Sequence, residues 1–174
     1  YDLHVNGQRL TETGFQPGWT QFDKHTSYVT TDLTSTLKKE SNILGAVLAD
    51  GWYRGNLLWM GREKFGKTTR FSGQLEVEYR DGSRERFSTD GSWKASFGPI
   101  RQSDIMNGEI YDARSEQAGW DRPGFMASSW QPVVVEPRSS VVVASRKVDV
   151  TARVRELMDA GKPILARNSL ALGD

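Results

Sequence analysis

The stretch that decides the fold is TRFSGQLEVEYRDGSRERFST, residues 69–89. Between Phe71 and Tyr79, an apolar residue or a glycine occupies every second position. Side chains of a β-strand alternate between two faces, so these residues share one face of a strand. Asp-Gly-Ser at 81–83 then provides a tight turn, and the residues after it are again strand-like. Residues 69–88 are therefore predicted to form a β-hairpin.

Short strands are predicted along most of the remaining chain. The N-terminal YDLHV alternates and is followed by Asn6-Gly7, a pair that favours the positive φ angles of a hairpin turn. The other strand segments are SYVTTDL (27–33), NILGAVLA (42–49) and two runs within PVVVEPRSSVVVAS (132–145). Many short strands separated by Gly and Pro are typical of an antiparallel β-sandwich. The fold class is therefore predicted to be all-β.

Helix signals are few. DLTSTLKKESN (32–42) is predicted to hold one or two turns, with Asp32 or Thr34 as the N-cap. The clearer signal is VTARVRELMDAG, where apolar residues recur at helical spacing before a Gly and a Pro, which predicts a short helix near 151–160. Residues 1–145 are predicted to form the sandwich domain. Residues 146–174 are interpreted as a linker or the start of a next domain. Because the chain opens directly on the strand-like YDLHV without a starting Met, we interpret it as a piece of a longer protein.

Composition narrows the function classes. The chain has 174 residues, enough for one domain with a core. Its net charge of +1 gives no reason to expect nucleic acid or an anionic membrane as a partner. It has no cysteine, which excludes disulfides and thiolate metal sites, and no apolar run reaches the ~18 residues of a membrane span. None of these features indicates a cellular compartment.

The segment GEIYDARSEQAGW, residues 108–120, gathers three acids around Arg114. Glycosidases act through a pair of carboxylates, about 5 Å apart in retaining enzymes and about 6.5–9.5 Å apart in inverting ones. In a strand, Glu109 and Asp112 point to opposite faces, whereas Asp112 and Glu116 share a face about 13 Å apart. The spacing favours a charged structural strand around a partly buried Arg114. Glu109 is the one residue of this segment that we would test at a substrate surface.

Other site signals are weaker. His4 and His25 are isolated, and no metal-binding, phosphate-binding or nucleophile motif occurs. Several aromatic residues lie beside Gly or Asp in predicted turns, and Trp52 and Tyr53 are suited to stacking against a sugar. Trp93 and Trp130 are expected to be structural. Asp50, at the start of the glycine-rich loop ADGWYRG, is a turn residue or one oxygen ligand of a calcium ion.

A series of motifs resembles a known family. In order along the chain they are VNGQRL (5–10), PGWTQFDK (17–24), YVTTDLT (28–34), ADGWYRG (49–55), YRDGS (79–83), DGSWKASFGPI (90–100), GEIYDAR (108–114) and SSWQPV (128–133). Together they resemble the N-terminal jelly-roll β-sandwich of bacterial α-L-rhamnosidases of glycoside hydrolase family 78. The resemblance covers about residues 1–135 well and continues weakly to the end.

The resemblance implies a domain without catalysis of its own, because the catalytic carboxylates of that family lie in a separate helical barrel. Some members use the jelly roll to hold L-rhamnose through calcium. By position, Asp23 and Asp50 correspond to their acidic residues, and carbonyl ligands would fall between Gly98 and Asp104. Gly51 stands where the binding members have Asn, and Gln21 stands where they have a second acid.

Three functions follow from these observations. The first is a non-catalytic accessory domain of an α-L-rhamnosidase, which packs against the catalytic domain of the same polypeptide and requires no cofactor. The second is a calcium-dependent module for a rhamnose-containing glycan, with Asp23, Asp50, Trp52, Tyr53 and Glu109 as carbohydrate-binding residues and Asp50 as the calcium ligand. The third is an enzyme in its own right that uses the acids of 109–116.

Overall fold

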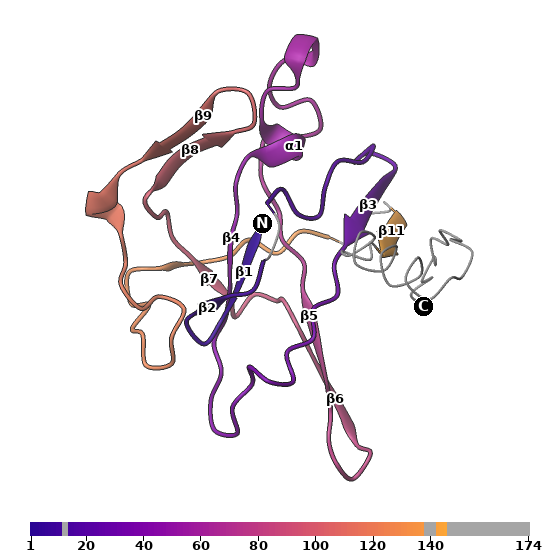
Figure 1. Ribbon diagram of the computed structural model, residues 1–174, viewed down its shortest axis with the longest axis vertical. Helices are drawn as coiled ribbons and strands as arrows, with labels where there is room; N and C mark the ends of the chain where they lie inside the picture. The colour runs from indigo at the N-terminus through magenta and orange to yellow at the C-terminus, as the bar shows by residue number, and fades with distance from the viewer. Residues whose placement is uncertain (12–13, 138–141, 146–174) are drawn as a thin grey trace, which may run out of the picture.

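The computed structural model describes residues 1–11, 14–137 and 142–145, and most of its regular structure is β-strand (Figure 1). The strands are β1 (Asp2–Val5), β2 (Gln8–Arg9), β3 (His25–Tyr28), β4 (Leu44–Val47), β5 (Gln74–Glu78), β6 (Arg84–Ser88), β7 (Lys94–Ala95), β8 (Ile100–Asp104), β9 (Gly108–Tyr111), β10 (Gln131–Pro132) and β11 (Val142–Ser145). The helical elements are α1 (Gly51–Arg54) and two 3₁₀ turns, at Leu58–Met60 and Ala113–Ser115. The predicted all-β class is confirmed.

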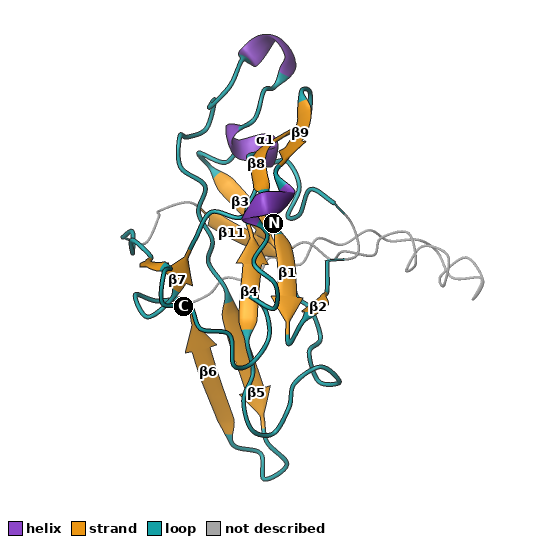
Figure 2. Ribbon diagram, turned by 90° about the vertical axis from the view of Figure 1, so that its left-hand side faces the viewer, coloured by secondary structure: helices purple, strands orange, loops and turns teal. Residues whose placement is uncertain are grey.

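Strand pairing divides the described residues into five small ladders. β1 lies between β2 and β4 in an antiparallel three-stranded sheet, while β5–β6, β7–β10 and β8–β9 form antiparallel pairs and β3–β11 a parallel one. The β5–β6 hairpin lies at one end of the molecule, and α1 with its neighbouring loops lies at the opposite end (Figure 2). These ladders do not by themselves define a jelly roll, so that topology stays a prediction.

Both predicted hairpin turns are present. Asn6 and Gly7 have φ angles of 52° and 86°, the positive values that a two-residue turn between β1 and β2 requires. In the second hairpin, Gln74 pairs with Ser88 and Glu78 with Arg84, which is the register expected from the alternation. Its polar face carries cross-strand ion pairs, such as Arg86–Glu76 at 2.8 Å, while Leu75 and Phe87 pair opposite one another.

The predicted helix at 32–42 is reduced to a single turn. The Leu37 amide donates to the Leu33 carbonyl at 3.0 Å, and the Asp32 carboxylate accepts from the Thr34 amide at 2.9 Å. Leu33 is buried beneath this turn. The predicted helix near 151–160 and the interpretation of 146–174 as a linker lie outside the described residues. None of the helices within the described ranges is long and apolar enough to cross a membrane.

The interior is small and includes a cluster of His4 and two Trp rings. Trp120 packs on the His4 ring with centroids 4.9 Å apart and lies directly over Gly45, where a Cβ atom would collide with the indole. His4 Nδ1 lies 2.8 Å from the Asp121 carboxylate, and both side chains are largely buried. Trp130 is stacked near Trp120, which confirms its predicted structural role. These contacts join the strand pair β1–β4 to the loop that precedes β10.

Candidate functional site

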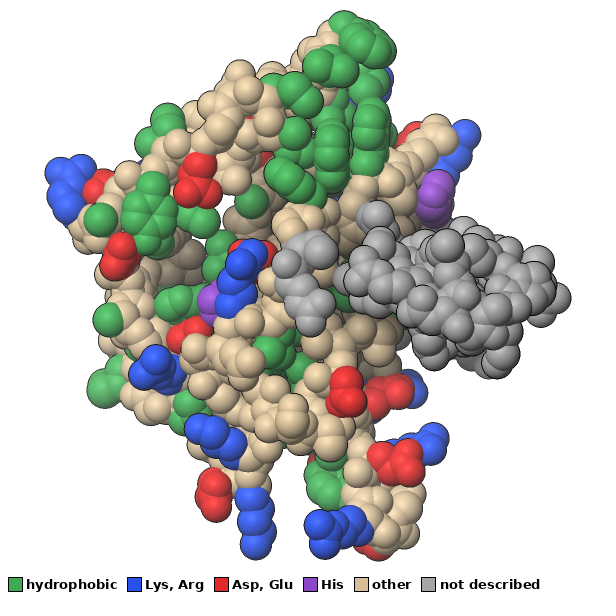
Figure 3. All heavy atoms as spheres, viewed as in Figure 1, with side chains coloured by type: hydrophobic (Ala, Val, Ile, Leu, Met, Phe, Trp, Pro, Cys, Tyr) green, Lys and Arg blue, Asp and Glu red, His purple; other side chains and the backbone are tan. Residues whose placement is uncertain are grey.

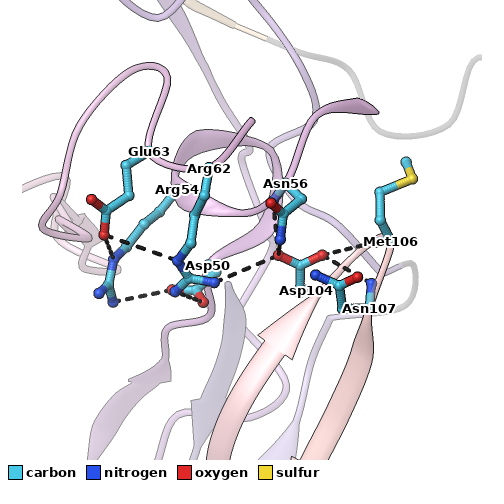
Figure 4. A network of polar contacts seen from close by, with 8 residues as sticks. All are labelled: Asp50, Arg54, Asn56, Arg62, Glu63, Asp104, Met106 and Asn107. Atoms are coloured by element: carbon cyan, nitrogen blue, oxygen red, sulfur yellow. Dashed lines mark hydrogen bonds and ion pairs between the residues drawn. The ribbon is translucent and has the colours of Figure 1, made fainter. Parts of the chain in front are cut away.

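The loop that begins at Asp50 carries a network of ion pairs rather than a free carboxylate (Figure 4). Asp50 immediately precedes α1, and its side chain is only 11% exposed. Arg54, one turn later, places Nη1 3.2 Å from Asp50 Oδ1. Arg62, from the loop after the first 3₁₀ turn, places Nη2 2.6 Å from Asp50 Oδ2. Both carboxylate oxygens are therefore paired with guanidinium groups.

Asp104, at the end of β8, is the buried centre of this network, with a side chain that is 0% exposed. Its Oδ2 accepts from the backbone and side-chain amides of Asn56 at 2.8 and 2.9 Å. Its Oδ1 accepts from the backbone amides of Met106 and Asn107 at 2.9 and 3.0 Å, and Arg62 Nη1 approaches Oδ2 to 3.6 Å. Burial alone would raise the pKa of Asp104. The hydrogen bonds from Asn56, Asn107 and Met106 together have the larger effect, so the pKa lies below its usual value.

This arrangement does not fit a calcium ion. Calcium takes six to eight oxygen ligands, most of them from carboxylates and carbonyls. Here Asp50 faces two guanidinium groups, Asp104 faces four N–H donors, and Gly51 offers no side-chain oxygen. Among the described residues, no group of three or more acidic, His or Cys side chains could hold a metal. A calcium ion at Asp50 would have to displace Arg54 and Arg62.

Trp52 and Tyr53 belong to two separate rows of aromatic contacts. Trp52 stacks on Trp19 with centroids 5.3 Å apart and planes inclined by 9°. Phe15 also packs against Trp52, with centroids 6.1 Å apart. Tyr53 contacts Phe22 edge-to-face at 5.5 Å, and Phe22 contacts Phe65 at 5.1 Å. Figure 3 shows hydrophobic side chains gathered at this end of the molecule. The two predicted sugar-stacking residues thus support other aromatic rings.

Trp19 and Phe65, together with Thr20 and Gln21, line a shallow depression of about 330 Å³ that is open to the surface. Asp23 lies in the exposed turn after Gln21 and makes no hydrogen bond or ion pair within the described part of the chain. Asp50 and Asp23 therefore belong to different surroundings. Phe65, Arg62 and Asp104 were not singled out from the sequence, because each becomes part of a site only through contacts with distant segments.

The acidic segment 108–116 differs from its prediction. β9 ends at Tyr111, and Asp112 caps a 3₁₀ turn by accepting from the Arg114 amide at 3.1 Å. The expected continuous strand is therefore wrong beyond Tyr111, since this local hydrogen bond competes with strand pairing. Arg114 does pair with Asp112, at 2.8 Å, but its side chain is 90% exposed, so the expected partial burial is also wrong.

The acids of this segment have separate partners. Glu116 accepts a hydrogen bond from the Tyr111 hydroxyl at 2.7 Å, and this bond raises the pKa of Tyr111. The Arg114 guanidinium, which donates to Asp112, lowers the pKa of that carboxyl. The Glu109 side chain is exposed and makes no hydrogen bond or ion pair to any described residue. Of the site residues predicted from the sequence, Asp50, Trp52 and Tyr53 lie together at α1, Asp23 follows Phe22, which contacts Tyr53, and Glu109 lies on β9.

Comparison with known proteins identifies the class of domain. Residues 1–155 match the model of the α-L-rhamnosidase N-terminal domain family. An α-L-rhamnosidase of Streptomyces avermitilis is 43% identical over 133 residues, which cover 76% of this chain and 13% of that protein. An α-L-rhamnosidase of Formosa agariphila is 31% identical over 177 residues, covering 100% of this chain and 19% of that protein.

Solved structures of α-L-rhamnosidases are also similar to this chain. The crystal structure of the Streptomyces avermitilis α-L-rhamnosidase in complex with L-rhamnose has a TM-score of 0.73 at 42% identity, covering 75% of this chain and 13% of that one. The native α-L-rhamnosidase of Aspergillus terreus has a TM-score of 0.75 at 33% identity, covering 84% and 18% of the two chains. The chain belongs to the α-L-rhamnosidase N-terminal domain family and spans less than a fifth of these relatives.

Proposed function

We propose that the chain is a non-catalytic accessory domain of an α-L-rhamnosidase and that it packs against the catalytic domain of the same polypeptide. The observation that carries this proposal is the amount of apolar surface left open. Val5, Leu33 and Leu57 are the buried hydrophobic residues of the described ranges, whereas large apolar side chains are exposed on several elements. Contiguous apolar surface that stays exposed marks interaction sites, and we infer such a site on these elements.

The exposed residues lie on elements that form no layer with a second sheet. On the β8–β9 hairpin, Met106, Ile110 and Tyr111 are about half exposed, and all four residues of β9 are exposed. On the β5–β6 hairpin, Tyr79 and Phe87 are similarly open. A neighbouring domain of the parent protein would cover such surfaces. We also propose that this all-β domain has the jelly-roll topology that the sequence resemblance implies.

The absence of catalysis is supported by how the acids are engaged. Asp112 is paired with Arg114, Glu116 with the Tyr111 hydroxyl, and Asp50 with two arginines. A glycosidase needs one carboxylic acid and one carboxylate facing each other across the scissile bond. Glu109 is exposed on β9 and does not line the depression at Trp19 and Phe65. The catalytic pair would therefore belong to the remainder of the parent polypeptide.

The experiment combines activity with association. The purified chain is expected not to hydrolyse an aryl α-L-rhamnoside, but to co-purify with the separately produced remainder of its parent protein. Ile110→Asp should weaken this association, and Arg84→Asp, on the exposed polar face of β6, is the matched control. Hydrolysis by the chain alone that Glu109→Gln abolishes would refute the proposal.

A further inference from the structure

We propose that Asn107 is a site of spontaneous deamidation, and that the product loosens the buried junction around the Asp104 carboxylate. This inference is independent of the accessory role, because it concerns a chemical change in the chain itself. An Asn-Gly pair offers this reaction the least steric resistance, since glycine has no Cβ atom beside the attacking amide. The chain has two such pairs, Asn6-Gly7 and Asn107-Gly108, and the structure places them in opposite surroundings.

The Asn6 side chain is held by three hydrogen bonds. Its Nδ2 donates to the Thr36 carbonyl at 3.0 Å and to Asn42 Oδ1 at 2.8 Å. Its Oδ1 accepts from the Ile43 amide at 3.0 Å. For the reaction, the side chain would have to turn toward the Gly7 amide and give up these bonds at a half-buried position. The fold therefore protects Asn6.

Asn107 has none of these restraints. It lies in the exposed turn between β8 and β9, and its side-chain amide makes no hydrogen bond within the described part of the chain. A Cβ atom at Gly7 would lie 2.7 Å from Arg122 Nε, whereas one at Gly108 would meet no atom within 4 Å apart from its chain neighbours. Gly108 is also the first residue of β9, so its amide lies at the end of a ladder, where pairing opens most readily.

The reaction needs water as its only co-reactant. The Gly108 backbone nitrogen attacks Asn107 Cγ, and the proton from that nitrogen leaves with the side-chain NH2 group as ammonia, which closes a succinimide ring. Water then opens the ring at one of its two carbonyls. Opening at Cγ gives aspartate, whereas opening at the main-chain carbonyl gives isoaspartate, whose main chain runs through Cβ and Cγ. Both products carry a carboxylate that asparagine lacks.

The modified residue belongs to the Asp104 junction. The Asn107 backbone amide donates to Asp104 Oδ1 at 3.0 Å, and Figure 4 shows the two residues side by side. Isoaspartate adds an atom to the main chain directly after Cα of residue 107, so the turn that presents this amide changes shape. Either product also places a second negative charge near the completely buried Asp104 carboxylate. The deamidated chain is therefore expected to be less stable.

The test is peptide mapping by mass spectrometry of the folded 174-residue chain, incubated in mildly alkaline buffer. Exchange of NH2 for OH raises the mass of a peptide by about one dalton. We expect this gain at Asn107 to be at least about tenfold faster than at Asn6, because Asn6 must first be released by local opening. In urea, where both sites are unfolded, the two rates should become similar. Equal rates in the folded chain, or a difference that persists in urea, would overturn the proposal.

The consequence for Asp104 is tested by the urea midpoint of the aged chain, which should fall in step with its isoaspartate content. Asn107→Gln is the matched control, because its longer side chain closes such a ring far more slowly. It should show no mass gain at position 107 and keep its midpoint during the same incubation. Asn107→Asp carries the new charge on an unchanged main chain and separates the two causes. An unchanged midpoint in the fully deamidated chain would overturn the link to Asp104.

Discussion

Replacement of Asp104 by Asn should destabilise the chain far more than a single charge change at the surface. The carboxylate accepts four N–H donors from Asn56, Met106 and Asn107, and it is completely shielded from solvent. An amide keeps one acceptor oxygen and turns its NH2 group toward two of these donors. Two buried donors are then left without a partner, at a cost of about 1–3 kcal/mol each. We therefore expect a loss of about 2–6 kcal/mol in the free energy of unfolding.

Equilibrium unfolding in urea, followed by circular dichroism, measures this loss. With a slope near ~2 kcal/mol per M, the midpoint should fall by about 1–3 M. Asp112→Asn is the matched control, because Asp112 also accepts several hydrogen bonds but only from its neighbour Arg114, at an exposed position. Its midpoint should change far less. Equal midpoints for the two variants would refute the assignment of Asp104 as a buried junction.

The same substitution has a defined pH dependence. The pKa of Asp104 is lower in the folded chain than its ordinary value of about 3.9. A carboxylate with a lowered folded-state pKa stabilises the fold above the unfolded pKa and loses that contribution as pH falls through the folded value. The difference between the native chain and Asp104→Asn should therefore be full at neutral pH and shrink below about pH 4. A difference that grows under acid would contradict this account.

Three further substitutions test other parts of the structure. Arg62→Ala should lower the free energy of unfolding by about 1–2 kcal/mol, since it leaves Asp50 and Asp104 with one cation fewer. High salt should reduce this loss, which urea midpoints at two ionic strengths would measure. Gly45→Ala should lower the melting temperature and change the near-ultraviolet dichroism, because its Cβ would displace the Trp120 indole at a cost of about 1–3 kcal/mol. Arg114→Ala should leave the melting temperature unchanged within error, because the side chain is 90% exposed; a marked drop would restore the buried-network hypothesis.

Local patterns in the sequence predict the hairpins because the signals that form them are local. Alternation at 71–79 and the Asn6-Gly7 pair act within a few residues, and the structure confirms both. The strand predicted through Asp112 fails for a local reason too: its side chain hydrogen-bonds the Arg114 amide two residues later and closes a 3₁₀ turn. Propensity and alternation do not reveal such competition between a side chain and strand pairing.

The candidate site was harder to predict because its parts come from separate segments. Trp52 and Tyr53 stand out by their neighbours in the sequence, whereas Phe65 is linked to Tyr53 by way of Phe22. Asp50 resembles a calcium ligand until Arg62, twelve residues away, is brought to within 2.6 Å. One sequence does not indicate which cation faces a given carboxylate. The pairing of Asp50 with Arg62 depends on the course of the loop between them. The hydrogen bond from the Asn56 amide to Asp104 helps to fix that course.

The residues of α1 and its N-cap take part in two networks, one of ion pairs and one of aromatic contacts. Asp50 and Arg54, at its two ends, join the ion pairs that lead to Asp104 and the β8–β9 hairpin. Trp52 and Tyr53, in its middle, contact the rings of Trp19 and Phe22. A four-residue helix has too few internal hydrogen bonds to be stable alone, so its geometry is fixed by these outside contacts. The buried carboxylate at Asp104 therefore helps to set the position of both aromatic rows, because it accepts from Asn56, just after the turn from which both rows begin.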